Sequence, residues 1–178
     1  MPAALLVIDV QQRLTTGAEA AFEAGRVIER INTVSASARD AEAMVVMIQH
    51  EEHGPLAHAS AGWQLDPRLV VRPGDVRLRK TATDSFHDTE LQALLQARAI
   101  DRVVVCGLQS DFCVDTTTRR ALALGYPVVL VADGHSTIDN AVLTAAQISA
   151  HHAATLANIE SFGPRVSLVP AQGVRFAA

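Results

Sequence analysis

The 178-residue sequence is poor in cysteine and aromatic residues, and it has no long uninterrupted apolar run. Two cysteines, Cys106 and Cys113, are too few for a disulfide framework, which favours a reducing compartment. No apolar stretch is long enough to cross a bilayer, and no basic leader with a cleavage site precedes the first apolar run. The sequence therefore predicts a cytoplasmic protein that does not associate with a membrane.

Basic clusters and nucleotide-binding motifs are also missing. The 15 lysines and arginines are interspersed among 19 acidic residues, which argues against a nucleic-acid partner. There is no G-x-G-x-x-G after the first apolar run and no G-x-x-x-x-G-K-[ST], so no dinucleotide or phosphate loop is indicated. The absence of a G-x-S-x-G elbow and of a C-x-x-C pair weighs against serine α/β-hydrolases and thioredoxin-type redox proteins. We expect no cofactor.

Short apolar runs alternate with amphipathic stretches along the chain. The runs are typical of buried strands, and the stretches between them have helical spacing. Strands are expected at 4–8, 43–48, 76–79, 103–106, 127–131 and 166–169, and helices at 19–40, 88–99, 113–124 and 139–158. This alternation predicts βαβ units and an α/β fold, a parallel sheet sandwiched between helices. With no repeat or linker, residues 1–178 are expected to form one domain.

The stretch from Val103 to Tyr126 places a cysteine where a strand, a sharp turn and a helix meet. Unpaired N–H groups at a helix start favour a thiolate over a thiol, so Cys113 is a candidate nucleophile. Cysteine is also among the most commonly buried residues, and many first-turn cysteines only pack. Cys106 lies inside the apolar run and is interpreted as a core residue.

Two further ionisable side chains come at the ends of expected strands, Asp9 after the first and Lys80 at the end of the third. The carboxyl ends of parallel strands form one crevice, so these side chains could converge with Cys113. Together the three groups would suit acyl transfer. The carboxylate can take the thiol proton, the cation can hold the carboxylate and the thiolate in their charged forms, and the thiolate can attack a carbonyl carbon. The backbone N–H of Cys113 and another from the preceding turn could donate hydrogen bonds to the oxyanion. In known hydrolases one such donor lowers the activation barrier by about 3–4 kcal/mol. The alternatives are a loop cap for Asp9 and a solvated face for Lys80.

The segment 51–67 is irregular and rich in glycine, proline and serine, which is typical of a functional loop. It contains His53 and His58 and follows His50. Three histidines invite a zinc hypothesis, but their spacing matches no paired-ligand pattern, so hydrogen-bonding or solvated histidines are favoured and no metal is expected. Substrate contacts are expected at Trp63, Phe86 and Phe112 as apolar walls and at Gln11 and His50 as polar groups.

Four motifs resemble the isochorismatase-like cysteine hydrolase superfamily and follow its order over most of the chain. They are LLVIDVQ at 5–11, RKTATDSF around Lys80, CGLQSDFCVDTTTRRALALGY from Cys106, and VVLVADGHST at 128–137. The resemblance implies that Asp9 is the general base and later the acid, Lys80 the positioning cation and Cys113 the nucleophile. It also implies a non-proline cis peptide at Leu108–Gln109, which aims the Gln109 N–H at the oxyanion beside that of Cys113. The fold it implies is a three-layer α/β/α sandwich with a six-stranded, mostly parallel Rossmann-like sheet.

The chain differs from two branches of this superfamily in the residues of the site. Nicotinamidases of the superfamily bind a metal through an Asp-x-His pair, where this chain reads Ile48-Gln49-His50, and isochorismatases proper lack the cysteine. The chain is closer to the uncharacterised cysteine hydrolase branch, related to nicotinamidases and N-carbamoylsarcosine amidohydrolases.

Together these features predict a metal-independent hydrolase that cleaves the C–N bond of a small amide, carbamoyl or cyclic amide through a Cys113 thioester. By the resemblance it works as a homo-oligomer, a dimer or tetramer. The alternatives are a non-catalytic binding or assembly protein on the same scaffold and a single-cysteine redox sensor. The sensor would lack a resolving cysteine, because Cys106 is expected to be buried.

Overall fold

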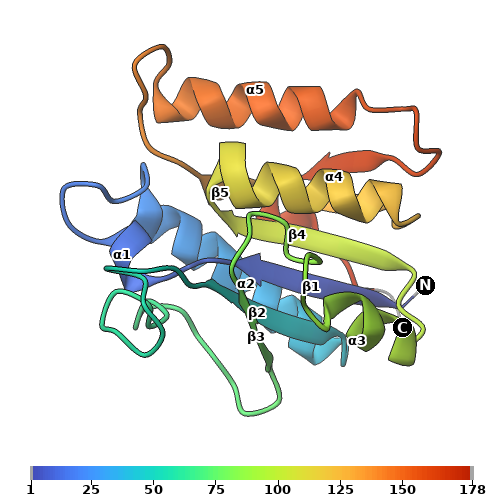
Figure 1. Cartoon of the computed structure of the whole chain (residues 1–178). Helices are drawn as coiled ribbons and strands as arrows, with labels where there is room; N and C mark the ends of the chain where they lie inside the picture. Colours follow the sequence, from blue (N-terminus) through green and yellow to red (C-terminus); the bar gives the residue numbers. More distant parts are fainter. Residues whose placement is uncertain (1, 177–178) are drawn as a thin grey trace.

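The computed structural model describes residues 2–176, which form a six-stranded, all-parallel sheet with helices on both faces (Figure 1). The strands are β1 (Ala3–Ile8), β2 (Met44–His50), β3 (Val76–Lys80), β4 (Arg102–Leu108), β5 (Val128–Ser136) and β6 (Val166–Val169), in the order β3-β2-β1-β4-β5-β6. Each expected strand forms. The α/β/α prediction is confirmed, and the sheet is wholly parallel where a mostly parallel one was expected.

The helices follow the predicted order, but three of them begin three or more residues later than expected. The helices are α1 (Gln12–Thr15), α2 (Ala24–Asp40), α3 (Leu91–Ala97), the π-helix η1 (Ser110–Val114), α4 (Asp115–Ala123), α5 (Ala145–Ala157) and the 3-10 helix η2 (Ala171–Gly173). The three that begin late are α2, α3 and α5. α2 starts after Glu23, whose φ of 51° is left-handed and interrupts the helix. α5 starts after Thr144, which forms a capping box with Gln147. The residue expected to cap it, Asp139, instead accepts a hydrogen bond from the Ala145 N–H at 2.8 Å.

Side chains from alternate positions of each strand build two separate apolar layers. From β1, Leu5 and Val7 pack with α2 and the C-terminal segment, whereas Leu6 and Ile8 pack with α3, α4 and α5. This is the two-residue period of a strand buried on both faces. Each fully buried leucine or isoleucine contributes about 1.5–3 kcal/mol. The helices therefore lie on both faces and leave the carboxyl ends of the strands free to carry a site.

The chain reverses its direction of travel across the sheet at β1. It runs outward to β2 and β3, then returns to place β4 on the other side of β1. Ile8 pairs with both Ile48 and Gly107 in this arrangement. A Cβ on Gly107, whose φ is +116°, would lie 2.1 Å from the Ile8 carbonyl oxygen, so only glycine allows this approach. The ends of β1 and β4 therefore meet at a topological switch point, where open α/β sheets bind ligands.

Asp66 connects the long segment between β2 and β3 to α1 through a hydrogen bond with Thr15. Its buried carboxylate accepts hydrogen bonds from the Thr15 hydroxyl at 2.6 Å and from the Arg68 guanidinium at 2.6 and 2.9 Å. Burial opposes ionisation of this carboxyl, but the hydrogen bonds from Arg68 and Thr15 outweigh it and lower the pKa of Asp66 to about 2. The ionised form is thus preferred in the folded protein.

We expect Asp66→Asn to lower the free energy of unfolding by about 2 kcal/mol at pH 7. Because the folded pKa lies below the ordinary value of 3.8, this stabilisation is complete above about pH 5 and is lost as the pH falls towards 2. Urea denaturation of both proteins between pH 3 and pH 7 measures it. A difference between the two that stays constant with pH would contradict the assignment.

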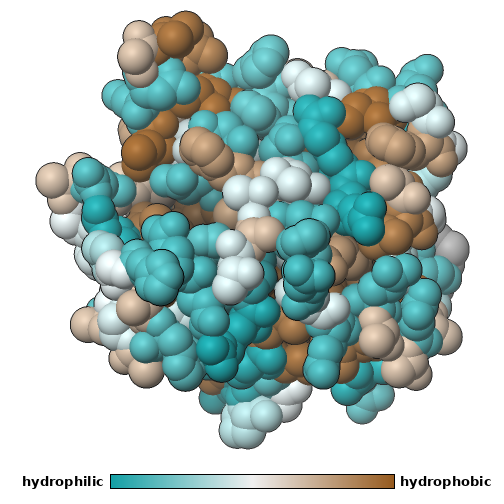
Figure 2. Space-filling model, viewed as in Figure 1, coloured by the Kyte–Doolittle hydropathy of each residue, from teal (hydrophilic) through white to brown (hydrophobic). Residues whose placement is uncertain are grey.

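The surface in Figure 2 is mainly hydrophilic, with apolar patches between the polar areas. One of these lies at the upper left, over the loop between β5 and α5. Ile138, Val142 and Leu143 of this loop are exposed, Val142 to 84%. Within residues 2–176, no helix combines the length and the apolarity that crossing a membrane requires.

Candidate active site

Asp9, Lys80 and Cys113 come together at the carboxyl ends of β1, β3 and β4. The Lys80 ammonium nitrogen lies 2.7 Å from Oδ2 of Asp9 and donates a hydrogen bond to the Cys113 sulfur at 3.2 Å. It also donates to the Ala82 carbonyl at 3.0 Å. The side chains of Lys80 and Asp9 are 0% and 1% exposed. A carboxylate, an ammonium and a thiol therefore form one buried, hydrogen-bonded group.

Strand register positions the two charged members of this group. Lys80 is the last residue of β3 and pairs with His50, the last residue of β2. Asp9 follows β1 with a left-handed φ of 52°, a region that aspartate tolerates better than most residues. Its N–H continues the ladder to the Ile48 carbonyl at 2.9 Å. The backbone turns away at this point, and the carboxylate is directed towards the Lys80 ammonium.

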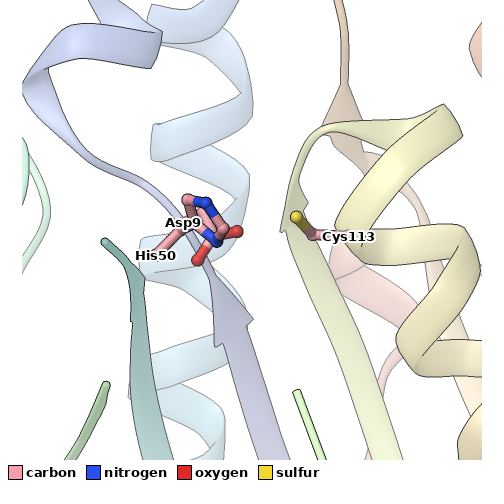
Figure 3. A group of neighbouring side chains, drawn as sticks. All are labelled: Asp9, His50 and Cys113. Atoms are coloured by element: carbon pink, nitrogen blue, oxygen red, sulfur yellow. The ribbon is translucent and has the colours of Figure 1, made fainter. Parts of the chain in front are cut away.

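Cys113 lies in the π-helix η1, two residues before α4 begins. Figure 3 shows its sulfur directed across the crevice towards Asp9 and His50. The peptide bond between Leu108 and Gln109, just before η1, is cis. A helix start at the cysteine was expected, and the structure has a π-turn there instead. Such wide turns occur frequently at functional sites.

Polar contacts from β5 and α5 hold the η1 turn in place. The Ser110 hydroxyl is 2.8 Å from Nδ1 of His135 and 2.9 Å from the Ser149 hydroxyl. The Thr137 hydroxyl donates to Asp111 at 2.5 Å. Burial, more than the charge of neighbouring groups, lowers the pKa of His135 to about 4, so its ring is neutral near pH 7. The VADGHST motif therefore supports the turn that carries Cys113.

The electrostatics of the group differ from the expectation of a resting thiolate. Burial and the negative charge of Asp9 raise the pKa of the Cys113 thiol to about 12, because together they outweigh the attraction of Lys80. Burial also opposes the charge of Lys80, but Asp9 and Cys113 more than offset it and raise the pKa of the ammonium. Near pH 7 the sulfur is therefore a neutral thiol beside a buried ion pair, and the expectation that it is ionised at rest is wrong.

A cavity of about 230 Å³ opens over this group and gives it access to solvent. It is lined by Asp9, Leu14, His50, Glu52, Leu56, Thr83, Gln109, Phe112 and Cys113. Nδ1 of His50 lies 3.3 Å from the Lys80 nitrogen. Of the expected substrate contacts, His50 and Phe112 are therefore at the cavity, together with Gln109.

Three other expected contacts lie elsewhere. The Gln11 side chain is fully buried and is used on the backbone, donating to the His50 and Trp63 carbonyls and accepting from the His50 N–H, each at 2.9 Å. Trp63 lines a different cavity, beside Arg77 and Thr89, and packs edge-on against His58. Phe86 belongs to the apolar core and stacks on Tyr126. None of the three lines the cavity over Cys113.

The second cysteine and the candidate metal ligands occupy well-defined places in the structure. Cys106 is fully buried, and burial raises the pKa of its thiol, so it is a core residue remote from solvent. Asp9, His50 and Cys113 each offer a possible metal ligand, and within residues 2–176 they are the group whose ligand atoms lie within 4.8 Å of one another. His53 and His58 are not part of that group. The Lys80 ammonium already contacts all three of these side chains, so its positive charge would oppose a metal ion there.

Four cavity residues were missed by the sequence reasoning: Leu14, Glu52, Leu56 and Thr83. Glu52 and Leu56 belong to the irregular segment 51–67 that was expected to be functional, but the substrate contact predicted within it was Trp63. A larger cavity of about 610 Å³ lies at the opposite edge of the sheet, beside Arg39 and Asp75, and contains none of the expected catalytic residues.

The chain is similar to known hydrolases over most of its length. A family model described as the Isochorismatase domain matches residues 3–167. The chain is 44% identical over 138 residues to a streptothricin hydrolase from Streptomyces noursei, which covers 76% of this chain and 50% of that protein. It is 30% identical over 169 residues to the ureidoacrylate amidohydrolase of Cronobacter sakazakii, covering 73% and 72% respectively. The chain spans about half the length of the streptothricin hydrolases it matches.

The similarity extends to three-dimensional structure. A crystal structure of an isochorismatase family protein superposes with a TM-score of 0.87 at 36% identity and covers 94% of this chain and 97% of that one. The shared architecture includes the parallel sheet whose carboxyl edge carries Asp9, Lys80 and Cys113.

Proposed function

Because the chain belongs to the isochorismatase family, we propose that it is a cysteine-dependent hydrolase that cleaves the C–N bond of a small amide, carbamoyl or cyclic amide compound. The observation that carries the proposal is the contact of one ammonium with both a carboxylate and a thiol, at 2.7 and 3.2 Å, beneath a solvent-accessible cavity. The names of the matched relatives, a streptothricin hydrolase and a ureidoacrylate amidohydrolase, support the amide class.

In the first half of the reaction, Asp9 takes the proton from the Cys113 thiol as the sulfur attacks the carbonyl carbon. A base is needed because the thiol is neutral at rest, with a pKa of about 12. Lys80 stays protonated and stabilises the thiolate as it forms, through the hydrogen bond that it already donates. The N–H groups of Gln109 and Cys113 receive the oxyanion of the tetrahedral intermediate.

In the second half, the intermediate collapses and the C–N bond breaks. Asp9 returns its proton to the leaving nitrogen, and an acyl thioester remains on Cys113. Water then attacks the thioester carbonyl while Asp9 again acts as the base, and the carboxylic or carbamic acid leaves with the thiol restored. The apolar ring of Phe112 and the imidazole of His50 would contact the substrate, because both line the cavity. No step requires a metal.

A panel of small amides, carbamoyl compounds and lactams, assayed for release of ammonia or amine, tests the proposal. At least one member is expected to turn over. Rapid quenching followed by intact-protein mass spectrometry should detect Cys113 carrying one acyl group, which hydroxylamine removes. The step after acylation can be slowed so that the acylated protein accumulates. If a substrate turns over under these conditions and no acylated Cys113 is found, the thioester route is contradicted.

We further propose that residues 1–178 act as one hydrolase domain in a homo-oligomer, a dimer or tetramer, in the cytoplasm. The exposed apolar side chains of Ile138, Val142 and Leu143 support self-association. The matched family domain, which spans residues 3–167, supports a single catalytic unit.

A further inference from the structure

Glu52 is the charged residue at the mouth of the catalytic cavity. It comes two residues after the end of β2, its side chain is 59% exposed, and it lines the cavity over Cys113. It also lines two adjoining cavities, of about 220 Å³ beside Arg13 and about 430 Å³ beside His53. A substrate that extends beyond the reacting carbonyl into either of these cavities therefore passes the carboxylate of Glu52.

The other charges near Glu52 are already paired. Asp9, the second carboxylate of the catalytic cavity, is matched by Lys80, which is buried beneath the lining. Glu51 is held by Arg79 through two hydrogen bonds of 2.8 and 2.9 Å, and Arg13 forms an ion pair with Glu19. No lysine or arginine is among the residues that line the cavity over Cys113 in the described part of the chain.

His50 makes no hydrogen bond to Glu52. Its ring lies against the buried ion pair, with Nδ1 3.3 Å from the Lys80 nitrogen. Its Nε2 is 3.8 Å from the Glu52 carboxylate, beyond hydrogen-bonding distance. Among the residues that line the cavity, a ligand therefore meets the Glu52 carboxylate and no lysine or arginine.

We propose that Glu52 selects substrates that carry a cationic group, an ammonium or guanidinium, next to the amide that is cleaved, and disfavours substrates with a carboxylate there. This inference rests on the proposed function, because it assumes that Cys113 reacts with ligands in this cavity. A carboxylate at a partly exposed site still attracts a cation a few ångströms away, and it repels an anion by a similar amount.

Alkylation of Cys113 tests the inference without a known substrate. Three probes differ in charge: iodoacetamide is neutral, iodoacetate is anionic, and N-(2-trimethylammonioethyl)iodoacetamide is cationic. In each reaction an S–C bond forms, the C–I bond breaks, iodide leaves, and the thiol proton passes to Asp9 or to water. Intact-protein mass spectrometry with peptide mapping gives the rate at Cys113. The quantity compared is a ratio of alkylation rates, that of the cationic probe divided by that of the anionic probe. Dividing it by the same ratio measured with N-acetylcysteine removes the intrinsic difference in reactivity between the two probes.

The normalised ratio is expected to exceed one in the wild-type protein and to fall by about tenfold in Glu52→Gln. Glu52→Lys should reverse the preference. Glu51→Gln is the matched control, since it removes the neighbouring carboxylate, which is paired with Arg79 outside this cavity, and should leave the ratio unchanged. Thermal denaturation verifies that each variant is folded.

A ratio that is the same in the wild-type protein, Glu52→Gln and Glu52→Lys would overturn the inference and leave the proposed function intact. Failure of every probe to label Cys113 in the folded protein would contradict the proposed function, and the inference would fall with it.

Discussion

Replacing Cys113 with alanine is expected to lower kcat/KM for amide hydrolysis by at least about 10⁴-fold. The reason is that the variant has no atom that can form the thioester, whereas Asp9 and Lys80 remain paired at 2.7 Å. The measurement is amine release from any substrate that the amide panel identifies, with protein concentrations high enough to detect residual turnover. The rapid-quench mass spectrum should lose the acylated species.

Cys106→Ala is the matched control, because it makes the same chemical change seven residues earlier, in β4. Cys106 is fully buried and lies in the apolar layer against α2, so the variant loses some packing but retains catalysis. Turnover by Cys113→Ala at the wild-type rate would rule out the covalent mechanism. Equal losses in both variants would indicate a general folding defect, which thermal denaturation would reveal.

Asp9→Asn is expected to reduce kcat by about 10²–10⁴-fold. The side chain keeps its size and can still accept a hydrogen bond from Lys80, but it can no longer take a proton from the thiol. Burial, the largest cause of the raised pKa of Cys113, remains in the variant, so without the base the sulfur stays protonated at pH 7. Activity of the variant should therefore rise steeply at alkaline pH, where hydroxide can remove the proton. Steady-state kinetics between pH 6 and pH 10 measures this.

Asp66→Asn provides the comparison for Asp9→Asn, because Asp66 is also a buried carboxylate paired with a cation but lies outside the catalytic cavity. It should lose stability and keep kcat near the wild-type value. If Asp9→Asn retained wild-type kcat and the same pH profile, Asp9 would not be the base. In that case the ion pair with Lys80 would have a structural role only.

Much of the architecture could be predicted from local patterns. Apolar runs such as Ala4 to Ile8 are buried on both faces, which is typical of a central strand of a parallel sheet. Asp9 and Lys80 stood out because a polar residue at the end of such a run lies at the edge of the sheet where ligands bind. Helix boundaries were less predictable. The 139–158 helix begins at Ala145 because the Thr144–Gln147 capping box fixes its start.

The pocket walls were not predictable in the same way. Phe86 and Trp63 are aromatic residues near the site in sequence, but an aromatic ring is equally suited to a core and to a cavity wall. Phe86 packs against Tyr126, forty residues away, and Trp63 faces Arg77. The Gln11 amide satisfies the backbone N–H and carbonyl of His50, at the end of β2, and the carbonyl of Trp63. Such assignments depend on partners that are distant in the chain.

The sequence by itself determined the layered α/β/α sandwich and the identity of the three groups that meet at its edge, because strand periodicity and strand ends are local properties. Only the tertiary structure decided that Cys113 is a neutral thiol, since its pKa depends on burial and on the charges of Asp9 and Lys80, which come from two other strands. It also decided that Glu52 lines the cavity over Cys113, where no lysine or arginine is among the lining residues. Electrostatic energies depend on distance in space, and the sequence does not specify those distances until the chain has folded.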